Sequence, residues 1–335
     1  MRAHLVLAGM RASIAHSFKG PKAVSAMDGS VARPRPFLAL GLRLAAAGTL
    51  ATLSMLVKLA SERGASLTEL VFWRQIITLI AITLFLVALG RMADLRTKRR
   101  KAHGVRAVMG IIGMFFVYGA VILLPLAEAT AINFTAPFFA VILAVLFFKE
   151  RVGKYRWGAV TLGFAGVLVL SGAGFGFGGG PAIDPLGAIV GLIAAFLVAL
   201  ISFQLQDLNK TESPWSIVFW FTLFTAPALA LTLPFVYVPH TLETWGIIGA
   251  MGLCGALAQL LLTASLRFGS AGVILLMDYT ALLWATYYGW SVFDVTPSAN
   301  LWAGAPLIVA AGLLIAWRER KLALLRQKTD VNRQH

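Results

Sequence analysis

Long runs of apolar residues, separated by short polar and basic clusters, make up most of this chain. About 20 consecutive apolar residues are needed for an α-helix to cross the hydrocarbon core of a bilayer. A window of that length finds ten runs, near residues 37–59, 68–90, 104–124, 127–148, 155–171, 185–206, 215–236, 243–265, 271–292 and 299–317. The fifth run is the weakest by length and the ninth is the least hydrophobic. The pattern predicts an all-α integral membrane protein with ten transmembrane helices.

The two halves of the chain read as copies of one another. Five small or apolar positions recur at one constant spacing: Ala107, Gly110, Gly113, Ala129 and Ile132 correspond to Gly249, Gly252, Gly255, Ala271 and Ile274. Because each copy holds five spans, an odd number, the second copy must insert upside down relative to the first. We therefore expect two inverted five-helix repeats that enclose a solute pocket near the bilayer midplane, which is the geometry of a secondary transporter.

These repeats define the expected domain organisation. Residues 37–171 form the first repeat and residues 185–317 the second, with a Gly-rich linker at 172–184 between them. A basic tail at 1–36, which we expect to be disordered, precedes the first repeat, and a second basic tail at 318–335 follows the last span. Glycines spaced along the third and eighth spans predict close packing of those helices with their neighbours.

Composition and charge fit a chain in lipid. Only 13% of the residues are charged, the mean hydropathy is +0.82 and the net charge is +15. If the N-terminus is cytoplasmic, 24 of the 29 Lys and Arg residues fall in cytoplasmic segments, and Arg63 alone falls in an outer loop. That asymmetry predicts that both termini are cytoplasmic. The lipid bilayer is thus the expected partner and nucleic acid is not, because the basic residues have no interleaved aromatics or recognition motif. The oligomeric state stays open.

Signatures of enzymes are missing from the spans. No phosphate-binding GxxxxGK[ST] loop and no GxSxG elbow occur, so ATP-driven pumping and hydrolase chemistry are disfavoured. The histidines all fall in tails or loops, which disfavours an intramembrane metal site: His4, His16, His103, His240 and His335. We expect no catalytic residue, no metal and no cofactor. A polytopic membrane enzyme or a sensor remains the alternative of another class, and the duplication and the lack of a soluble domain count against it.

Two charges lie deep within predicted spans. Arg74 is about 9 Å below the outer boundary of the second span, and Asp278 is about 10 Å above the inner boundary of the ninth. A buried charge is costly in lipid and needs a reason. We hypothesise that both side chains face the central cavity and either pair with each other or bind opposite ends of a polar solute. Asp278 is also a candidate proton carrier. The alternative is a structural, hydrogen-bonded charge.

Other charged residues lie near the ends of the spans. Arg43, Arg106 and Lys58 are expected to extend their charged groups to the membrane surface. Glu69 and Glu128 are expected to be ordinary charges at the outer rim.

Aromatic and amide side chains supply further candidates for binding. Tyr279 and Trp284 lie too deep in the ninth span for the interfacial aromatic belt, so they either stack on a flat substrate or pack between helices. The remaining polar or amphipathic candidates for the cavity are Trp73, Asn133, Gln204 and Gln259.

Two segments resemble a known family. Leu124–Leu170 strongly resembles the end of an EamA domain of the drug/metabolite transporter superfamily, and Met277–Arg320 resembles the same region of a second copy. Phe72–Arg74 also fits, and the resemblance covers about residues 37–320. It implies ten helices as two inverted repeats, a central cavity, alternating access without ATP and a location in the bacterial inner membrane.

The resemblance leaves the solute open. Members of this superfamily move amino acids, riboflavin, S-adenosylmethionine, sugars and drugs, in either direction. The deep aromatics together with Arg74 and Asp278 favour a flat, polar heterocycle, so riboflavin-type uptake is our first hypothesis for this small-molecule solute. The alternatives are S-adenosylmethionine uptake and proton-coupled export of an amino acid or another metabolite.

Overall fold

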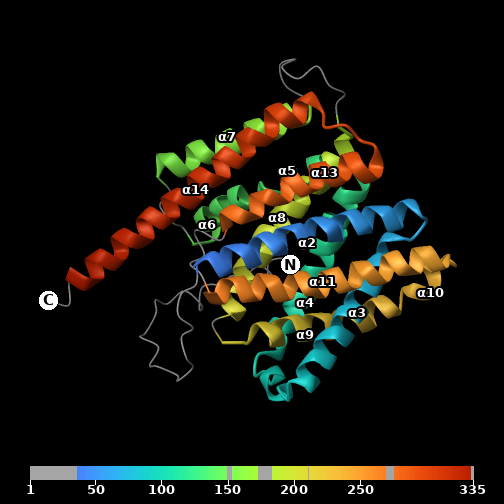
Figure 1. The fold of residues 1–335 in the computed structure, drawn as a ribbon. Helices are drawn as coiled ribbons and strands as arrows, with labels where there is room; N and C mark the ends of the chain where they lie inside the picture. Colours follow the sequence, from blue (N-terminus) through green and yellow to red (C-terminus); the bar gives the residue numbers. More distant parts are fainter. Residues whose placement is uncertain (1–35, 149–152, 173–182, 210, 269–274, 333–335) are drawn as a thin grey trace, which may run out of the picture.

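The computed structural model describes residues 36–148, 153–172, 183–209, 211–268 and 275–332, and these form a bundle of helices without strands (Figure 1). The all-α prediction is therefore confirmed for the described residues. The tail at 1–36 and the linker at 172–184 lie almost wholly outside these ranges. Residues 318–332, within the predicted basic tail at 318–335, continue the last helix as far as Asn332.

The helices follow the predicted runs in order. The first half contains α2 (Pro36–Glu62), α3 (Leu67–Ala88), the 3₁₀ helix η1 (Met92–Leu95), α4 (Arg100–Leu123), α5 (Leu126–Asn133), α6 (Ala136–Phe148) and α7 (Lys154–Leu170). The second half contains α8 (Pro185–Leu208), α9 (Pro214–Ala230), α10 (Leu233–Val236), α11 (Leu242–Phe268), the 3₁₀ helix η2 (Leu275–Thr280), α13 (Ala281–Phe293) and α14 (Ala299–Asn332).

Polar side chains fix several helix starts. Ser66, Asp184 and Ser213 each accept a hydrogen bond from a backbone N–H in the first turn of α3, α8 and α9, respectively. Such N-caps satisfy N–H groups that the helix itself leaves unpaired. Pro185 and Pro214 occupy the first position of α8 and α9, where a missing N–H costs nothing.

Seven helices in the described part of the chain are long and apolar enough to cross a membrane. They coincide with predicted spans one to four, six, eight and ten. The other three predicted spans correspond to α7 and α9, with 17 residues each, and α13, with 13 residues. At 1.5 Å per residue, 17 residues cover about 25 Å, short of a core of about 30 Å. The count of ten spans is thus not confirmed by helix length.

Two of the predicted spans are interrupted rather than continuous. The fourth span divides into α5 and α6 at Phe134 and Thr135, just before Pro137, whose ring is incompatible with an unbroken helix there. In the ninth span, the 3₁₀ helix η2 precedes α13 and contains Asp278. Such breaks are tolerated at membrane depth where protein or a cavity surrounds the freed backbone groups.

The two halves pack as counterparts. Helix α2 packs on α11 as α4 packs on α8, and α3 packs on α11 as α4 packs on α9. Helix α13 packs on α2 as α5 and α6 pack on α8, while α3–α9 and α7–α14 are contacts between equivalent helices. Exchanging the halves therefore reproduces these contacts between the halves, as expected for a duplicated bundle.

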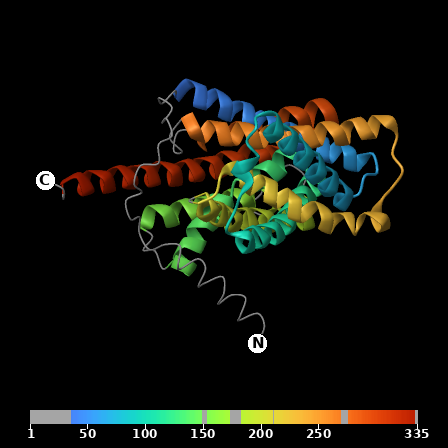
Figure 2. The ribbon, with the colours of Figure 1, turned by 90° about the horizontal axis from the view of Figure 1, so that it is seen from below.

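Helices α7 and α14 lie side by side at one edge of the bundle, and α14 extends beyond its neighbours towards the C-terminus (Figures 1 and 2). The two helices lie close together at Gly166 and Gly304. A Cβ on Gly304 would lie 2.6 Å from the carbonyl oxygen of Gly166 and 2.7 Å from the backbone nitrogen of Leu170. Only glycine permits this backbone contact, which is the typical way in which helices pack closely in lipid.

Candidate functional site

Asp278 forms an ion pair with Arg43, not with Arg74. The Nε and Nη2 atoms of Arg43 on α2 each donate to one carboxylate oxygen of Asp278 at 2.6 Å. The Arg43 side chain is 9% exposed and that of Asp278 34% exposed. The expectation that Arg43 extends to the membrane surface is therefore wrong, because a carboxylate at the same depth holds its guanidinium in the bundle. This bidentate pair joins the first half of the chain to the second.

Arg74 lies elsewhere in the interior. Its Nη1 atom lies 3.3 Å from Oε1 of Gln75 and 3.2 Å from the sulfur of Met114 on α4. Its guanidinium is 5.9 Å from the centroid of the Tyr118 ring, and its buried Nε atom has no hydrogen-bond partner. Gly255 of α11 makes room for it, since a Cβ there would lie 3.1 Å from Nε.

Arg106 was missed as an interior residue. Its guanidinium lies 4.4 Å from the centroid of the Phe221 ring on α9, and its buried Nε and Nη1 atoms have no hydrogen-bond partner. Gly110, one turn further along α4, has no side chain and so leaves space for the Arg106 guanidinium and the Phe221 ring. The expectation that Arg106 extends to the membrane surface is wrong, because the side chain points along α4 into the bundle.

The aromatic candidates do not form one stack. Trp73 donates from Nε1 to Glu69 at 3.3 Å and contacts Trp245 edge to face. Tyr279 contacts Phe134 edge to face, and its hydroxyl lies against Gly312 of α14. Trp284 is 40% exposed and stacks on Tyr288.

The amide candidates lie on three different helices. Asn133 ends α5, and its buried Oδ1 atom has no partner. Gln204 on α8 has a buried Oε1 atom without a partner. Gln259 is half-buried on α11. The structure does not show these three gathered around one point.

Two hollows of about 480 Å³ each open on the bundle. One lies between the ends of α2, α4 and α13 and is lined by Lys58, Glu62 and Asp294 among others. The second lies beside α2, with Trp284, Tyr288, Thr52 and Cys254 in its wall. Neither hollow contains Arg74 or Arg106, whose side chains are half-buried between the helices.

The glutamates expected at the outer rim are buried instead. We call the side of the bundle where α2 begins the proximal face and the side where it ends the distal face. Near the distal face, Glu69 is 0% exposed, and its Oε1 atom lies 2.9 Å from Nε2 of His240 in the second half. Glu128 is 3% exposed and accepts a hydrogen bond from Ser298. The histidine and serine partners, distant in sequence, explain why both carboxyl groups are tolerated inside.

Lys58 also folds inwards at the distal end of α2. Its ammonium group donates to the carbonyl oxygens of Val121, Ile122 and Leu124 at 2.9–3.3 Å. These carbonyls belong to the last turn of α4 and to Leu124, which directly follows it, where the helix leaves them without a partner. Lys58 thus caps α4 rather than extending to the membrane surface.

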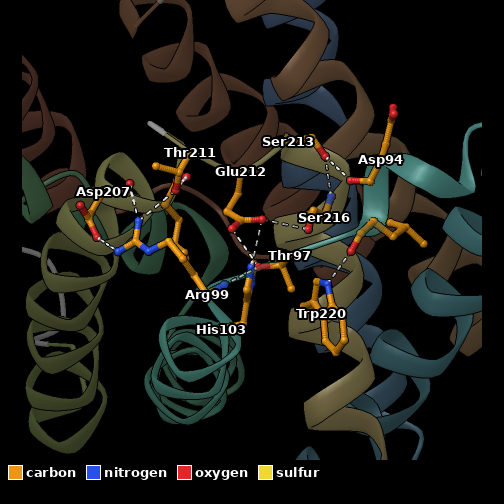
Figure 3. Close-up of polar contacts among 12 residues, drawn as sticks. Asp94, Thr97, Arg99, His103, Asp207, Thr211, Glu212, Ser213, Ser216 and Trp220 are labelled. Carbon is orange, nitrogen blue, oxygen red and sulfur yellow. Dashed lines mark hydrogen bonds and ion pairs between the residues drawn. The ribbon is translucent and has the colours of Figure 1, made fainter.

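A polar network joins the two halves at the proximal face (Figure 3). Arg99 donates to Asp207 at 2.5 Å and to Thr211 at 3.1 Å, and Thr97 donates to Glu212 at 2.8 Å. The fully buried His103 lies 3.6 Å from Glu212. On the distal side, Arg63–Glu243 and Glu69–His240 also pair residues of opposite halves. The halves are therefore fastened to each other at both faces.

Removing one of these contacts has a measurable cost. We expect Arg99→Ala to lower the free energy of unfolding by about 1 kcal/mol, because it breaks a partly exposed ion pair and its accompanying hydrogen bonds. Arg91→Ala is the matched control, since Arg91 pairs only with Asp94 in the same loop and is exposed; we expect a change below about 0.5 kcal/mol. Thermal unfolding of the purified protein measures both, and equal effects would contradict a role for Arg99 in joining the halves.

Comparison with known proteins identifies the type of molecule. The model of the EamA-like transporter family matches residues 37–172 and 185–317. A riboflavin transporter of Rhizobium johnstonii is 31% identical over 255 residues, which cover 75% of this chain and 81% of that protein. A pseudopaline exporter of Pseudomonas aeruginosa is 28% identical over 277 residues, covering 79% of this chain and 92% of that protein. A riboflavin transporter of Vibrio cholerae is 27% identical over 254 residues, covering 73% and 81%.

A solved structure supports the fold alone. It is 22% identical, covers 82% of this chain and 96% of its own, and superposes with a TM-score of 0.54. The relatives are transporters and not enzymes, in agreement with the prediction from the sequence, and they imply a small-molecule solute and a membrane location. Because the family model matches well over half of the residues in two successive segments, this chain belongs to the EamA-like transporter family.

Proposed function

We propose that this protein is a secondary active transporter that moves a small organic metabolite across the bacterial inner membrane by alternating access. In this proposal, ten helices form two inverted halves, residues 37–171 and 185–317, and both termini are cytoplasmic. The contacts between the halves that recur when the halves are exchanged, and the excess of Lys and Arg in the segments predicted to be cytoplasmic, support the arrangement.

One observation carries the proposal. Ion pairs and hydrogen bonds fasten the two halves at the proximal face, through Arg43–Asp278 and Arg99–Asp207, and at the distal face, through Arg63–Glu243 and Glu69–His240. Between these two layers lie buried polar atoms without partners, including those of Arg74 and Arg106. Alternating access requires contacts between the halves that open at one face at a time. It also requires polar groups between the two faces that are free to bind the solute.

Riboflavin-type uptake is the first candidate for the solute. It rests on the riboflavin transporters among the relatives and on donor groups in the interior that suit the carbonyl oxygens of a flavin. Stacking between Tyr279 and Trp284 does not support it, because the two rings point to different neighbours. The second candidate is metabolite export, which the relationship to a pseudopaline exporter favours. S-adenosylmethionine ranks below both, since its sulfonium cation would meet unpaired arginines.

Transport into proteoliposomes tests the proposal. We expect vesicles containing the purified protein to accumulate at least one labelled solute from a panel of riboflavin, S-adenosylmethionine and amino acids, faster than empty vesicles. Vesicles carrying an imposed proton gradient, or none, show whether protons are coupled to the movement. Uptake equal to that of empty vesicles for every solute, in both directions, would count against a transporter of these metabolites.

A further inference from the structure

Two arginines in the middle of the bundle lack an acidic partner. Of the arginines in the described part of the chain, Arg43, Arg63, Arg91 and Arg99 each pair with a carboxylate at 2.5–2.6 Å. By contrast, no carboxylate lies within ion-pair distance of Arg74 or Arg106 among the described residues. Nε of Arg74 and both Nε and Nη1 of Arg106 are buried without any hydrogen-bond partner. Within the described part of the chain, no carboxylate therefore compensates their charges.

Both guanidinium groups lie along the same face of α4. Arg106, Gly110, Met114 and Tyr118 recur every four residues, so they form one stripe on this helix. Arg106 extends over Gly110, while Arg74 reaches across from α3 to contact Met114 and lies over the Tyr118 ring. The Cα atoms of residues 106 and 114 are about 12 Å apart along the axis. The charge of Arg74 acts on that of Arg106, and the two repel each other.

Further polar groups without partners surround Arg74. The hydroxyl oxygens of Thr78, one turn along α3, and of Tyr118 are both buried and have no hydrogen-bond partner. Arg74 and Thr78 face the same point, since a Cβ on Gly255 would lie within 3.6 Å of a polar atom of each. We call Arg74, Arg106, Thr78 and Tyr118 the arginine site.

The bundle itself does not need this charge. The offset of 142 residues that relates Gly110 to Gly252 places Ile248 at the position equivalent to Arg106. Ile248 is 1% exposed, so the equivalent helix packs with an apolar side chain at this level. Burying an unpaired charge costs free energy that an apolar residue would not. Packing of the helices therefore does not account for the charge of Arg106.

We propose that the arginine site binds an acidic group of the transported solute, a carboxylate or a phosphate. Guanidinium is the side chain best suited to both, because its planar set of N–H donors matches two oxygens of either group. This inference rests on the proposed function and narrows it. It ranks organic acids and phosphorylated compounds, including a phosphorylated flavin, above neutral riboflavin and above cationic solutes.

Ligands that differ only in the acidic group test the inference. The thermal midpoint of the purified protein is measured with a thiol-reactive dye that reports on Cys254, the one cysteine of the chain. The probes are riboflavin against riboflavin 5′-phosphate, succinamide against succinate, and inorganic phosphate at constant ionic strength. The variants are Arg74→Gln and Arg106→Gln, with Arg91→Gln as the control for loss of an arginine outside the bundle interior.

We expect the acidic probe of at least one pair to raise the midpoint of the wild type by about 2 °C or more, and its neutral counterpart not to do so. The rise disappears in both interior variants and persists in Arg91→Gln. A rise with the phosphate-bearing probes alone identifies a phosphate site, and a rise with succinate alone identifies a carboxylate site. Equal effects of acidic and neutral probes, a rise that persists in both interior variants, or no rise with any acidic probe would overturn the inference.

A second measurement needs no ligand. Without solute, Arg106→Ile should raise the midpoint by about 2 °C or more, because it removes an unpaired buried charge and installs the residue of the equivalent helix. A fall in the midpoint would mean that Arg106 is structural. The transport assay separates the two proposals. If the protein binds anions but transports none of the solutes, the proposed function as a transporter is wrong. If Arg74→Gln and Arg106→Gln transport a neutral solute at wild-type rates, only the inference about the arginine site is wrong.

Discussion

Replacing Asp278 with asparagine should lower the free energy of unfolding by about 2 kcal/mol and reduce transport by about tenfold or more. The variant leaves the Arg43 guanidinium, whose side chain is 9% exposed, without its counter-charge. Breaking a fully buried pair costs about 3–5 kcal/mol, and the 34% exposure of Asp278 reduces that figure. Thermal unfolding and uptake by proteoliposomes measure the two effects.

The double variant Arg43→Gln with Asp278→Asn separates stability from transport. We expect it to regain most of the lost stability, because neither charge is then left unpaired and the two effects are coupled. We expect transport to stay low, because the proximal contact must close and open in each cycle. If Asp278→Asn alone transports at the wild-type rate, Asp278 serves neither as a contact between the halves nor as a proton carrier.

This pair also bears on Asp278 as a candidate proton carrier. Each of its carboxylate oxygens accepts one N–H donor from Arg43. The proton-coupling role stays a prediction from the sequence, and the transport rate of Asp278→Asn tests it.

The pairing of Arg43 with Asp278 could have been predicted from the sequence. The first and ninth spans begin at the same face, and each residue lies about two turns into its span, so the two are at equal depth. By the same reckoning, Arg74 and Asp278 differ in depth by about 11 Å across a core of about 30 Å. A comparison of depths would have predicted the observed pair. Treating each charge separately did not.

The remaining site residues depended on contacts that no spacing reveals. The apolar runs predicted the helices, because lipid requires nearly every lipid-facing side chain to be apolar. Arg106 was assigned to the membrane surface by its distance from the end of the span, but Gly110 and Phe221 hold it inside. Glu69 likewise depends on His240, 171 residues away, in a loop that folds back over α3. The sequence therefore predicts which helix a residue belongs to and how deep it lies in the membrane. The direction of its side chain and the residue that it contacts depend on how the helices pack.

Replacing Gly304 with alanine should cause the largest loss of stability among the glycine variants of α7 and α14, about 2 kcal/mol or more. The added Cβ would lie 2.6–2.9 Å from backbone and side-chain atoms of Gly166 and Leu170, closer than a methyl group can approach. Backbone atoms cannot turn aside as the end of a side chain can, so the two helices must separate. Since no hydrophobic effect drives helices together in lipid, the lost contact is not replaced.

Gly158→Ala in α7 is the matched control for Gly304→Ala. Gly158 is exposed, and a Cβ there would have no neighbour within 4 Å. We expect this variant to be more stable than the wild type by about 0.5–1 kcal/mol, because alanine restricts the unfolded backbone and favours helix. Opposite shifts in the thermal midpoints of the two variants would show that the α7–α14 contact depends on the small size of Gly304. Shifts of the same sign would mean that helix propensity, and not close packing, determines the stability of this edge of the bundle.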